Sequence, residues 1–235
     1  MGKSLDMGGS RIILALDNPL IDCVALADKL RGRIAGIKIG LPYILTKGSA
    51  QTRDFLKNFA EDFFFIADTK MADVGHVMVM TLEKLNEMNF DAAIVHGFVG
   101  VKNALDVLVE SSKELDMKLF MVAAMSHPGA EEMLNKSFKK LLDIAKDLDF
   151  YGIVLPATMP QYIRDARKIL GNKEMVIISP GVGAQGANPG DALKAGADFE
   201  IIGRLIVNAQ DPLKVVSHIN EVHSEIINER MRDQY

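Results

Sequence analysis

The sequence has very little cysteine and no excess of basic residues. Its 235 residues include one cysteine, Cys23, which cannot form a disulfide within one chain, and no Cys/His spacing resembles a zinc site. There are 27 lysines and arginines against 31 aspartates and glutamates, and the net charge is -4. No basic field is therefore available to attract nucleic acid or an anionic membrane. We expect a cytoplasmic protein that binds neither and that captures any phosphate group locally.

Long apolar runs are also missing. No stretch is long enough to span a membrane, and the opening residues MGKSLDMGGS lack the apolar core of a signal peptide. We expect residues 1–10 to form a flexible N-terminal lead. The chain as a whole is 49% hydrophobic and 25% charged, a balance that provides ample core for a globular fold.

One pattern repeats along the chain: a short apolar run, a polar or glycine-bearing turn, and then a helical periodicity. The apolar runs lie at residues 12–16, 34–39, 63–67, 92–95, 119–124, 152–155, 175–178 and 199–202. Strict alternation of strand and helix implies parallel pairing with right-handed crossovers. The pattern favours an α/β fold, a single-domain (β/α)8 TIM barrel over residues 11–228, rather than an open doubly wound sheet. An amphipathic segment from Pro212 to about Asn228 should close the outer layer, with residues 229–235 as a tail.

The most distinctive stretch is FFFIADTKMADVGH, at residues 63–76. Its apolar run does not alternate with polar residues, as expected of a strand covered on both faces in a parallel sheet. Asp68 and Lys70 end the run and project to the same side of an extended segment, and Asp73 follows where the next helix begins. Each charge in such a cluster is tolerable mainly because its neighbours have the opposite sign. Alone, however, the pattern is also typical of a structural ion pair.

Polar residues follow most of the other predicted strands as well. They are Asp17, Lys38, His96, Ser126 and His127. In a (β/α)8 barrel the chemistry takes place at the carboxyl ends of the strands, so this recurrence indicates a site there. His96 and His127 are equally well explained as structural residues, and we expect His218 and His223, in the last helix, to lie on the surface.

The loops after the seventh and eighth strands predict a phosphate-binding site. Glycines at 181, 183 and 186 would let backbone amides approach a ligand closely. Gln185 lies among them, and Gly203-Arg204 ends the eighth strand. Arginine offers a fixed, forked set of donors suited to phosphate. We therefore expect the substrate to be a phosphate ester.

Taken together, these motifs resemble the orotidine 5'-phosphate decarboxylases of the compact archaeal and bacterial type, from about Arg11 to Asp211. The matching strings are ALD at 15–17, IKIG at 37–40, ADTKMAD at 67–73, VHGF at 95–98, MSHPGA at 125–130, SPGVGAQG at 179–186 and GR at 203–204. The pattern ADxKxAD is shared with a wider suite of sugar-phosphate decarboxylases and aldolases, whereas MSHPGA and SPGVGAQG are much more specific.

The resemblance implies cofactor-free and metal-free conversion of orotidine 5'-phosphate to uridine 5'-phosphate in de novo pyrimidine biosynthesis. It also implies a homodimer with shared active sites. Asp17 and Lys38 would hold ribose hydroxyls, and Lys38 would also belong to a charged chain leading to Lys70. Asp68 would lie beside the departing carboxylate, and Lys70 would protonate C6. Asp73 would enter the site of the neighbouring protomer.

The resemblance also assigns the other ligand contacts. Ser126 would meet the pyrimidine amide. Gln185, Gly203 and Arg204 would bind the phosphate. Pro180 and Val182 would help to wall the pocket.

One position departs from the family pattern. After the second aspartate the family usually carries a threonine that binds ribose across the dimer, whereas this chain reads Asp73-Val74-Gly75-His76-Val77. Val77 has no hydrogen-bonding side chain, and the loss of one such bond is worth about 1–2 kcal/mol. His76 is one candidate replacement, and a different course of the loop is another. Asp-x-Gly at this place also resembles the keto-gulonate phosphate branch of the suite.

Three alternatives therefore stay open from the sequence. One is a magnesium-dependent sugar-phosphate decarboxylase of the 3-keto-gulonate 6-phosphate type. Another is a Schiff-base aldolase that uses Lys38 or Lys70. The third is a nucleotide-binding barrel without catalytic activity, against which the intact set of charged residues argues.

Overall fold

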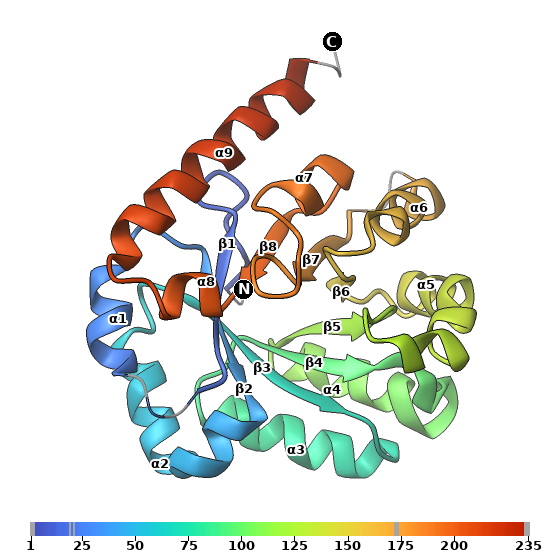
Figure 1. Ribbon diagram of the computed structural model, residues 1–235. Helices are drawn as coiled ribbons and strands as arrows, with labels where there is room; N and C mark the ends of the chain where they lie inside the picture. The colour runs from blue at the N-terminus through green and yellow to red at the C-terminus, as the bar shows by residue number, and fades with distance from the viewer. Residues whose placement is uncertain (1–2, 19, 21, 172–173, 233–235) are drawn as a thin grey trace.

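The computed structural model describes residues 3–18, 20, 22–171 and 174–232. Parallel strands close into a barrel in the order β1 to β8, and helices surround it (Figure 1). The strands are β1 (Ile12–Leu16), β2 (Gly36–Gly40), β3 (Phe64–Met71), β4 (Ala92–His96), β5 (Lys118–Val122), β6 (Gly152–Val154), β7 (Val176–Pro180) and β8 (Phe199–Ile202). The predicted (β/α)8 barrel is confirmed. Its largest boundary difference is β3, which continues past the predicted end at Ala67.

The outer layer follows the predicted alternation. Its helices are α1 (Cys23–Lys29), α2 (Leu41–Asn58), α3 (Gly75–Glu87), α4 (Asp106–Glu114), α5 (Phe138–Asp147), α6 (Pro160–Leu170), α7 (Asp191–Ala195), α8 (Arg204–Val207) and α9 (Pro212–Arg232). Short helical turns η1 (Gly97–Val99), η2 (Val101–Leu105), η3 (Pro128–Glu132) and η4 (Asn135–Ser137) lie in the loops. No helix in the described ranges is long and apolar enough to cross a membrane.

The last helix differs from its prediction in two ways. It runs to Arg232, past the predicted end near Asn228. His223, expected on the surface, is only 2% exposed. The reason is its place in the helix, since it follows Ile219 by four residues and precedes Ile226 by three. It therefore lies on the same buried stripe as these two isoleucines.

Side chains of β3 alternate between two apolar cores, which explains why its apolar run is uninterrupted. Phe64 belongs to the core inside the barrel, together with Ile13, Phe120 and Phe199. Phe65 belongs to the second core, which fills the layer between strands and helices. Successive side chains on a strand point to opposite faces, and both faces are covered here. Apolar side chains are consequently favoured at every position until the strand reaches the carboxyl end of the barrel.

Residues 3–10 contact the amino-terminal end of the barrel. Leu5 is 4% exposed and joins the core inside the barrel, and its N–H donates to the hydroxyl of Tyr151 at 3.1 Å. The ammonium of Lys3 donates to the carbonyl oxygens of Ala60, at 2.5 Å, and of Phe63. The buried leucine thus holds the described part of this segment against the strands. The flexible lead expected for residues 1–10 stays a prediction, and residues 1–2 lie outside the described residues.

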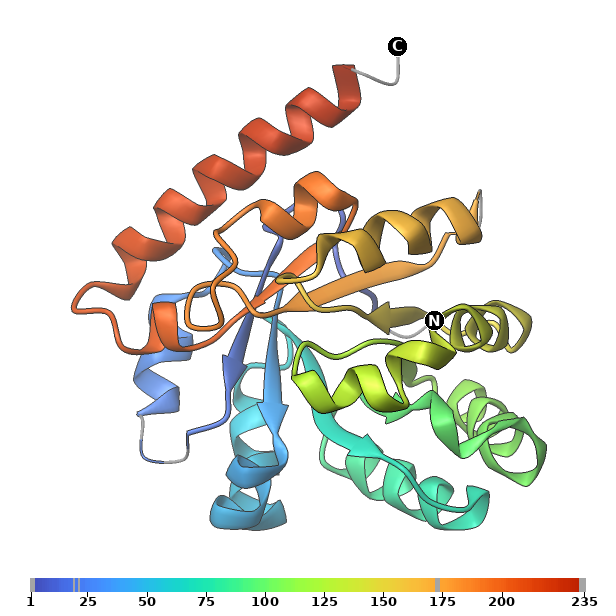
Figure 2. The same ribbon diagram turned by 45° about the vertical axis from the view of Figure 1, so that its right-hand side comes forward.

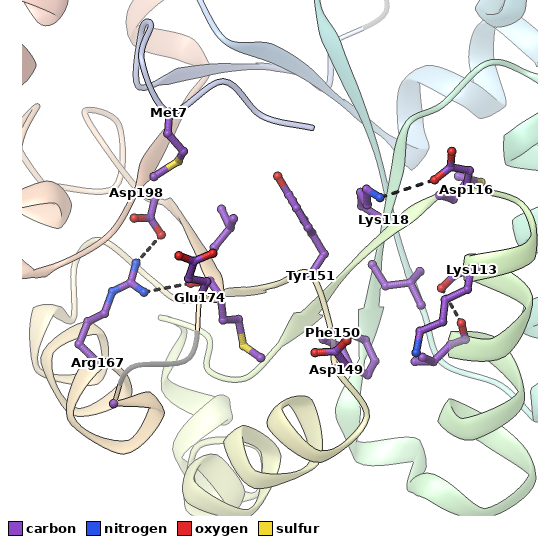
Figure 3. A pocket seen from close by; sticks show the side chains of 17 residues that line it. Met7, Lys113, Asp116, Lys118, Asp149, Phe150, Tyr151, Arg167, Glu174 and Asp198 are labelled. Atoms are coloured by element: carbon purple, nitrogen blue, oxygen red, sulfur yellow. Dashed lines mark hydrogen bonds and ion pairs between the residues drawn. The ribbon is translucent and has the colours of Figure 1, made fainter. Parts of the chain in front are cut away.

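A cavity of about 840 Å³ opens at the same end of the barrel. Figure 3 shows Arg167 and Asp198 facing each other there, and they form an ion pair. Arg167 also donates to the carbonyl oxygens of Gly196 and Met175, at 2.7 and 2.9 Å. Lys118 pairs with Asp116. The amino-terminal end of a (β/α)8 barrel usually serves stability rather than catalysis, and the pairing of these charges with protein groups fits that role.

We predict that Leu5→Ala lowers the free energy of unfolding by about 2–5 kcal/mol, the cost of removing a buried leucine and leaving a cavity. Urea unfolding measures the difference. Leu20→Ala serves as the control, since Leu20 is 89% exposed and a surface change of this kind stays within about 0.5 kcal/mol. Equal unfolding free energies for the two variants would mean that residues 3–10 are not part of the folded barrel.

Candidate active site

A second cavity, of about 600 Å³, lies at the carboxyl ends of the strands. The predicted site residues that line it are Asp17, Lys38, Asp68, Lys70, Ser126, Pro180, Val182, Gln185, Gly203 and Arg204. They come from the ends of different strands, separated widely in sequence, and the barrel brings them together. Of the residues that the family resemblance assigns to the site, Asp73 alone does not line this cavity.

Four side chains form a chain of alternating charge across the floor of the cavity. The ammonium Nζ of Lys38 lies 3.0 Å from Oδ1 of Asp17 and 2.8 Å from Oδ2 of Asp68. Nζ of Lys70 lies 2.6 Å from Oδ1 of Asp68. The side chains of Lys38 and Asp68 are 6% and 10% exposed, so this pair is largely removed from water. The four formal charges cancel, which makes the burial of Lys38 and Asp68 tolerable.

Gly40, at the end of β2, makes this arrangement possible. A Cβ atom at this position would lie 2.1 Å from Oδ1 of Asp17. Only glycine leaves room for the carboxylate to reach Lys38 on the neighbouring strand. The IKIG string therefore contributes two things to the site, the ammonium of Lys38 and the space beside it.

Burial and neighbouring charges shift the pKa values of Lys38 and Asp68 in opposite directions. Burial would lower the pKa of Lys38, but the carboxylates of Asp68 and Asp17 outweigh it, and the pKa is raised. Burial would raise the pKa of Asp68, but Lys38 and Lys70 outweigh it, and the pKa is lowered. Both groups are therefore held in their charged forms.

Lys70 has an unusual backbone conformation. Its φ is 45°, in the left-handed region that residues other than glycine seldom adopt. The β3–β4 register shifts between Ala67 and Met71, so Lys70 lies in a bulge. Such a conformation costs on the order of 1–3 kcal/mol and persists where the surroundings impose it. The bulge presents the ammonium of Lys70 to the cavity beside Asp68.

The glycine-rich loop after β7 is compact and partly closed on itself. Gly181, Gly183 and Gly186 all have positive φ. The N–H of Gly183 donates to the carbonyl of Ala187 at 2.7 Å, and the N–H of Gly186 donates to the carbonyl of Gly183 at 2.9 Å. These two amides are thus engaged within the turn. That other backbone amides of the two loops approach a ligand stays a prediction. The glycines shape the turn that carries Gln185.

Side chains bridge this loop to its neighbours around the cavity. The hydroxyl of Ser126, after β5, donates to Oε1 of Gln185 at 3.3 Å. Arg204 is exposed at the start of α8 and lines the cavity with Gly203.

Two asparagines also line the cavity. Asn208 lies one helical turn after Arg204, and Asn18 follows Asp17. Sequence reasoning missed these two asparagines, although the helical spacing of Asn208 from Arg204 was a usable signal.

Asp73 lies on the exposed surface, where its Oδ1 accepts the N–H of Val74 at 2.7 Å. Gly75 begins α3. A Cβ atom on Gly75 would lie only 2.6 Å from the carbonyl oxygen of Asn103, so a larger residue would not fit there. The Asp-x-Gly sequence at this place thus has a packing reason in this chain. His76 is exposed and Val77 is half-buried on α3.

His96 ends β4 as predicted but does not line the cavity. Burial lowers the pKa of its imidazole, and the positive charge of Lys70 lowers it further. Its ring packs on that of Phe98, with centroids 4.7 Å apart. Among the described residues, Nδ1 of His96 is buried without a hydrogen-bond partner.

We predict that Lys38→Met lowers the free energy of unfolding by about 3–5 kcal/mol at neutral pH, because it removes the buried partner of Asp68. The folded-state pKa of Asp68 is lowered. Its contribution is therefore present above the ordinary aspartate pKa of about 4 and is lost as the pH falls through the lowered value. The difference between wild type and variant should shrink on acidification.

Urea unfolding at neutral and acidic pH measures this difference. Lys84→Met is the matched control, since Lys84 forms an exposed pair with Glu87 and its loss should leave the free energy of unfolding nearly unchanged. A Lys38→Met effect that stays constant down to about pH 2 would contradict the charge coupling described here.

Comparison with known proteins agrees with this geometry. Residues 10–219 match the family described as Orotidine 5'-phosphate decarboxylase / HUMPS family. The orotidine 5'-phosphate decarboxylase of Aeropyrum pernix is 39% identical over 216 residues, which cover 90% of this chain and 87% of the relative. That of Methanosarcina mazei is 36% identical over 217 residues, covering 92% and 96%.

A solved structure agrees as well. The crystal structure of orotidine 5'-monophosphate decarboxylase from Sulfolobus solfataricus matches with a TM-score of 0.83 at 35% identity, covering 93% of this chain and 99% of that one. The match thus extends over nearly the whole barrel. This chain belongs to the orotidine 5'-phosphate decarboxylase / HUMPS family.

Proposed function

We propose that this chain is a carboxy-lyase that decarboxylates orotidine 5'-phosphate to uridine 5'-phosphate in pyrimidine biosynthesis. The observation that carries the proposal is the alternating chain of Asp17, Lys38, Asp68 and Lys70 in the cavity at the carboxyl ends of the strands. The names of the similar proteins support the same reaction.

The reaction breaks the bond between C6 of the pyrimidine and its carboxylate carbon. CO2 leaves, and the electron pair of the broken bond stays on C6. Lys70 stabilises the negative charge as it develops and then donates a proton to C6, after which the amine regains a proton from solvent. An ammonium already fixed in place does this without reorganisation during the reaction, and such preorganised electrostatics usually dominates catalysis.

Asp68 has two tasks in this proposal. It holds the ammonium of Lys70 at 2.6 Å, and it lies beside the position of the departing carboxylate. Lys38 engages its other oxygen at 2.8 Å, so the carboxylate of Asp68 cannot rotate freely. Asp17 and Lys38 would bind the ribose hydroxyls at the same edge of the cavity. The side chains that hold the catalytic ammonium thus also orient the sugar.

The other end of the cavity would bind the phosphate. Gln185, Gly203 and Arg204 line it, and a guanidinium pairs well with phosphate oxygens. Ser126 would contact the pyrimidine amide, with Pro180 and Val182 as walls. Energy gained from the remote phosphate can help to position the pyrimidine over Lys70.

Two alternatives from the sequence are less compatible with the site. A magnesium-dependent sugar-phosphate decarboxylase would need carboxylate oxygens for the metal, whereas both oxygens of Asp68 already face ammonium groups. A Schiff-base aldolase would need a neutral lysine, whereas flanking carboxylates raise the pKa of Lys38 despite its burial. The named relatives do not favour either alternative.

We predict that Lys70→Ala removes nearly all turnover of orotidine 5'-phosphate, because it deletes the proton donor. Arg204→Ala should instead raise KM by roughly 10- to 100-fold, the value of one or two hydrogen bonds to a charged group. Steady-state assays on the phosphorylated substrate, with binding of uridine 5'-phosphate and of uridine measured in parallel, check both. Equal losses of affinity for the two ligands in Arg204→Ala would show that Arg204 does not bind the phosphate.

A homodimer with shared active sites is a further part of the proposal, as is the cytoplasmic location indicated by the cysteine usage. Asp73 is exposed and outside the cavity of its own chain. Apolar side chains are exposed in its vicinity on α3 and the following segments, namely Val74, Met80, Phe98 and Val101. A second copy that covers this surface would bury them and would bring Asp73 toward the partner's cavity.

We predict that mixing Lys70→Ala and Asp73→Asn proteins, each nearly inactive, restores activity once subunits exchange. In a mixed dimer one site carries both defects and the other carries neither. Random exchange at equal amounts should restore about a quarter of the wild-type sites. Native mass spectrometry verifies the exchange. Mixed dimers without recovered activity would place the action of Asp73 within its own chain.

A further inference from the structure

A buried cluster of hydrogen-bonded polar side chains lies behind the two loops that we propose to form the phosphate end of the cavity. Glu200 on β8 is 0% exposed and His223 on α9 is 2% exposed. Nε2 of His223 lies 2.8 Å from Oε2 of Glu200. Both side chains lie in the predominantly apolar layer between strands and helices. Neither has a role in the reaction proposed above, and burying them has a cost that an apolar pair would avoid.

The carboxyl group of Glu200 also binds the backbone where the loop after β7 ends. Its Oε1 accepts the N–H groups of Gly190 and Ala192, both at 3.0 Å, and its Oε2 accepts the N–H of Gly190 at 2.9 Å. Gly190 closes the segment that carries Gln185 and precedes α7. Glu200 itself lies three residues before Gly203. One carboxyl group therefore links the ends of both loops.

Helix α9 fixes this junction from outside. It packs along α7 and α8 (Figure 2). Gly190 has a φ of 92°, and a Cβ atom there would lie 2.3 Å from Cδ1 of Ile226 and 3.1 Å from Cγ1 of Val222. Side chains of α9 thus pack directly against the backbone that Glu200 binds. His223, on the same helix, orients the carboxyl group of Glu200.

The neighbouring strand extends the cluster. Ser179 on β7 is the register partner of Glu200 and is 0% exposed. Within the described part of the chain, its hydroxyl and Nδ1 of His223 have no hydrogen-bond partner. Ser179 directly precedes Pro180, which lines the cavity. Polar groups are therefore concentrated where β7 and β8 lead into the two loops, and directional bonds fix backbone spacing more narrowly than apolar packing does.

We propose that Glu200, oriented by His223, is a positioning residue that sets the spacing between Gln185 and the Gly203-Arg204 pair and so governs capture of the substrate phosphate. The proposal rests on the phosphate site inferred above. Glu200 touches no substrate atom. Glu200 positions the loop after β7 through its hydrogen bonds to Gly190. It positions the loop after β8 through the backbone of β8, on which it lies.

The test uses Glu200→Gln and His223→Gln in the full chain, with uridine 5'-phosphate and uridine as probes. Each variant should weaken binding of uridine 5'-phosphate about tenfold, the scale of one hydrogen bond to a charged group, and leave the affinity for uridine unchanged. KM for orotidine 5'-phosphate should rise by the same factor. Arg230→Gln is the matched control, because Arg230 ties α9 to the carbonyls of Leu193 and Ala197, at the other end of α7.

Isothermal titration gives the affinities, and thermal unfolding shows that each variant is folded. Arg230→Gln should lower Tm without changing the preference for the phosphorylated ligand. If Glu200→Gln or His223→Gln behaves like Arg230→Gln, the cluster is only structural and the proposal is overturned. If Arg204→Ala also keeps the full preference for uridine 5'-phosphate, the phosphate site itself is wrong, which is a separate failure.

Discussion

The carboxylate of Asp68, held between the ammonium groups of Lys38 and Lys70, is the interaction on which the site depends. Each oxygen faces one lysine, at 2.8 and 2.6 Å, and the carboxylate is largely buried. Removing one partner of such a buried group typically costs about 3–5 kcal/mol, because the remaining charge is left uncompensated. The cluster therefore tolerates few changes. This rigidity is what an ammonium needs if it is to meet charge that develops at a fixed carbon atom.

The barrel supplies this cluster from neighbouring strands. β1, β2 and β3 pair in register, with Ala15 opposite Lys38 and Gly40 opposite Asp68, so their carboxyl ends deliver charges of alternating sign side by side. The loops after β7 and β8 follow next around the closed barrel, since β8 pairs with β1. In the proposed function the charged cluster carries out the chemistry and these two loops bind the phosphate, so that the substrate reacts at one end and is anchored at the other.

The features predictable from the sequence are those with a local or periodic signal. The apolar run of Phe63 to Ala67 indicated a strand buried on both faces, and the spacing of Asp68 and Lys70 indicated that their charges meet. The left-handed conformation of Lys70 had no such signal, because no glycine marks it and the fold imposes it. The burial of His223 depended on which face of α9 packs against the barrel. The burial of Leu5 depended on contacts with strands far along the chain. The engaged amides of Gly183 and Gly186 follow from a turn geometry that composition does not specify.

We infer that side chains alone supply the charge that decarboxylation requires. The most direct measurement is the absorbance of orotidine 5'-phosphate after addition of the purified protein in the presence of EDTA. We expect the absorbance to fall as uridine 5'-phosphate forms, at the same rate with and without the chelator. Loss of activity in EDTA, with recovery on addition of magnesium, would contradict it.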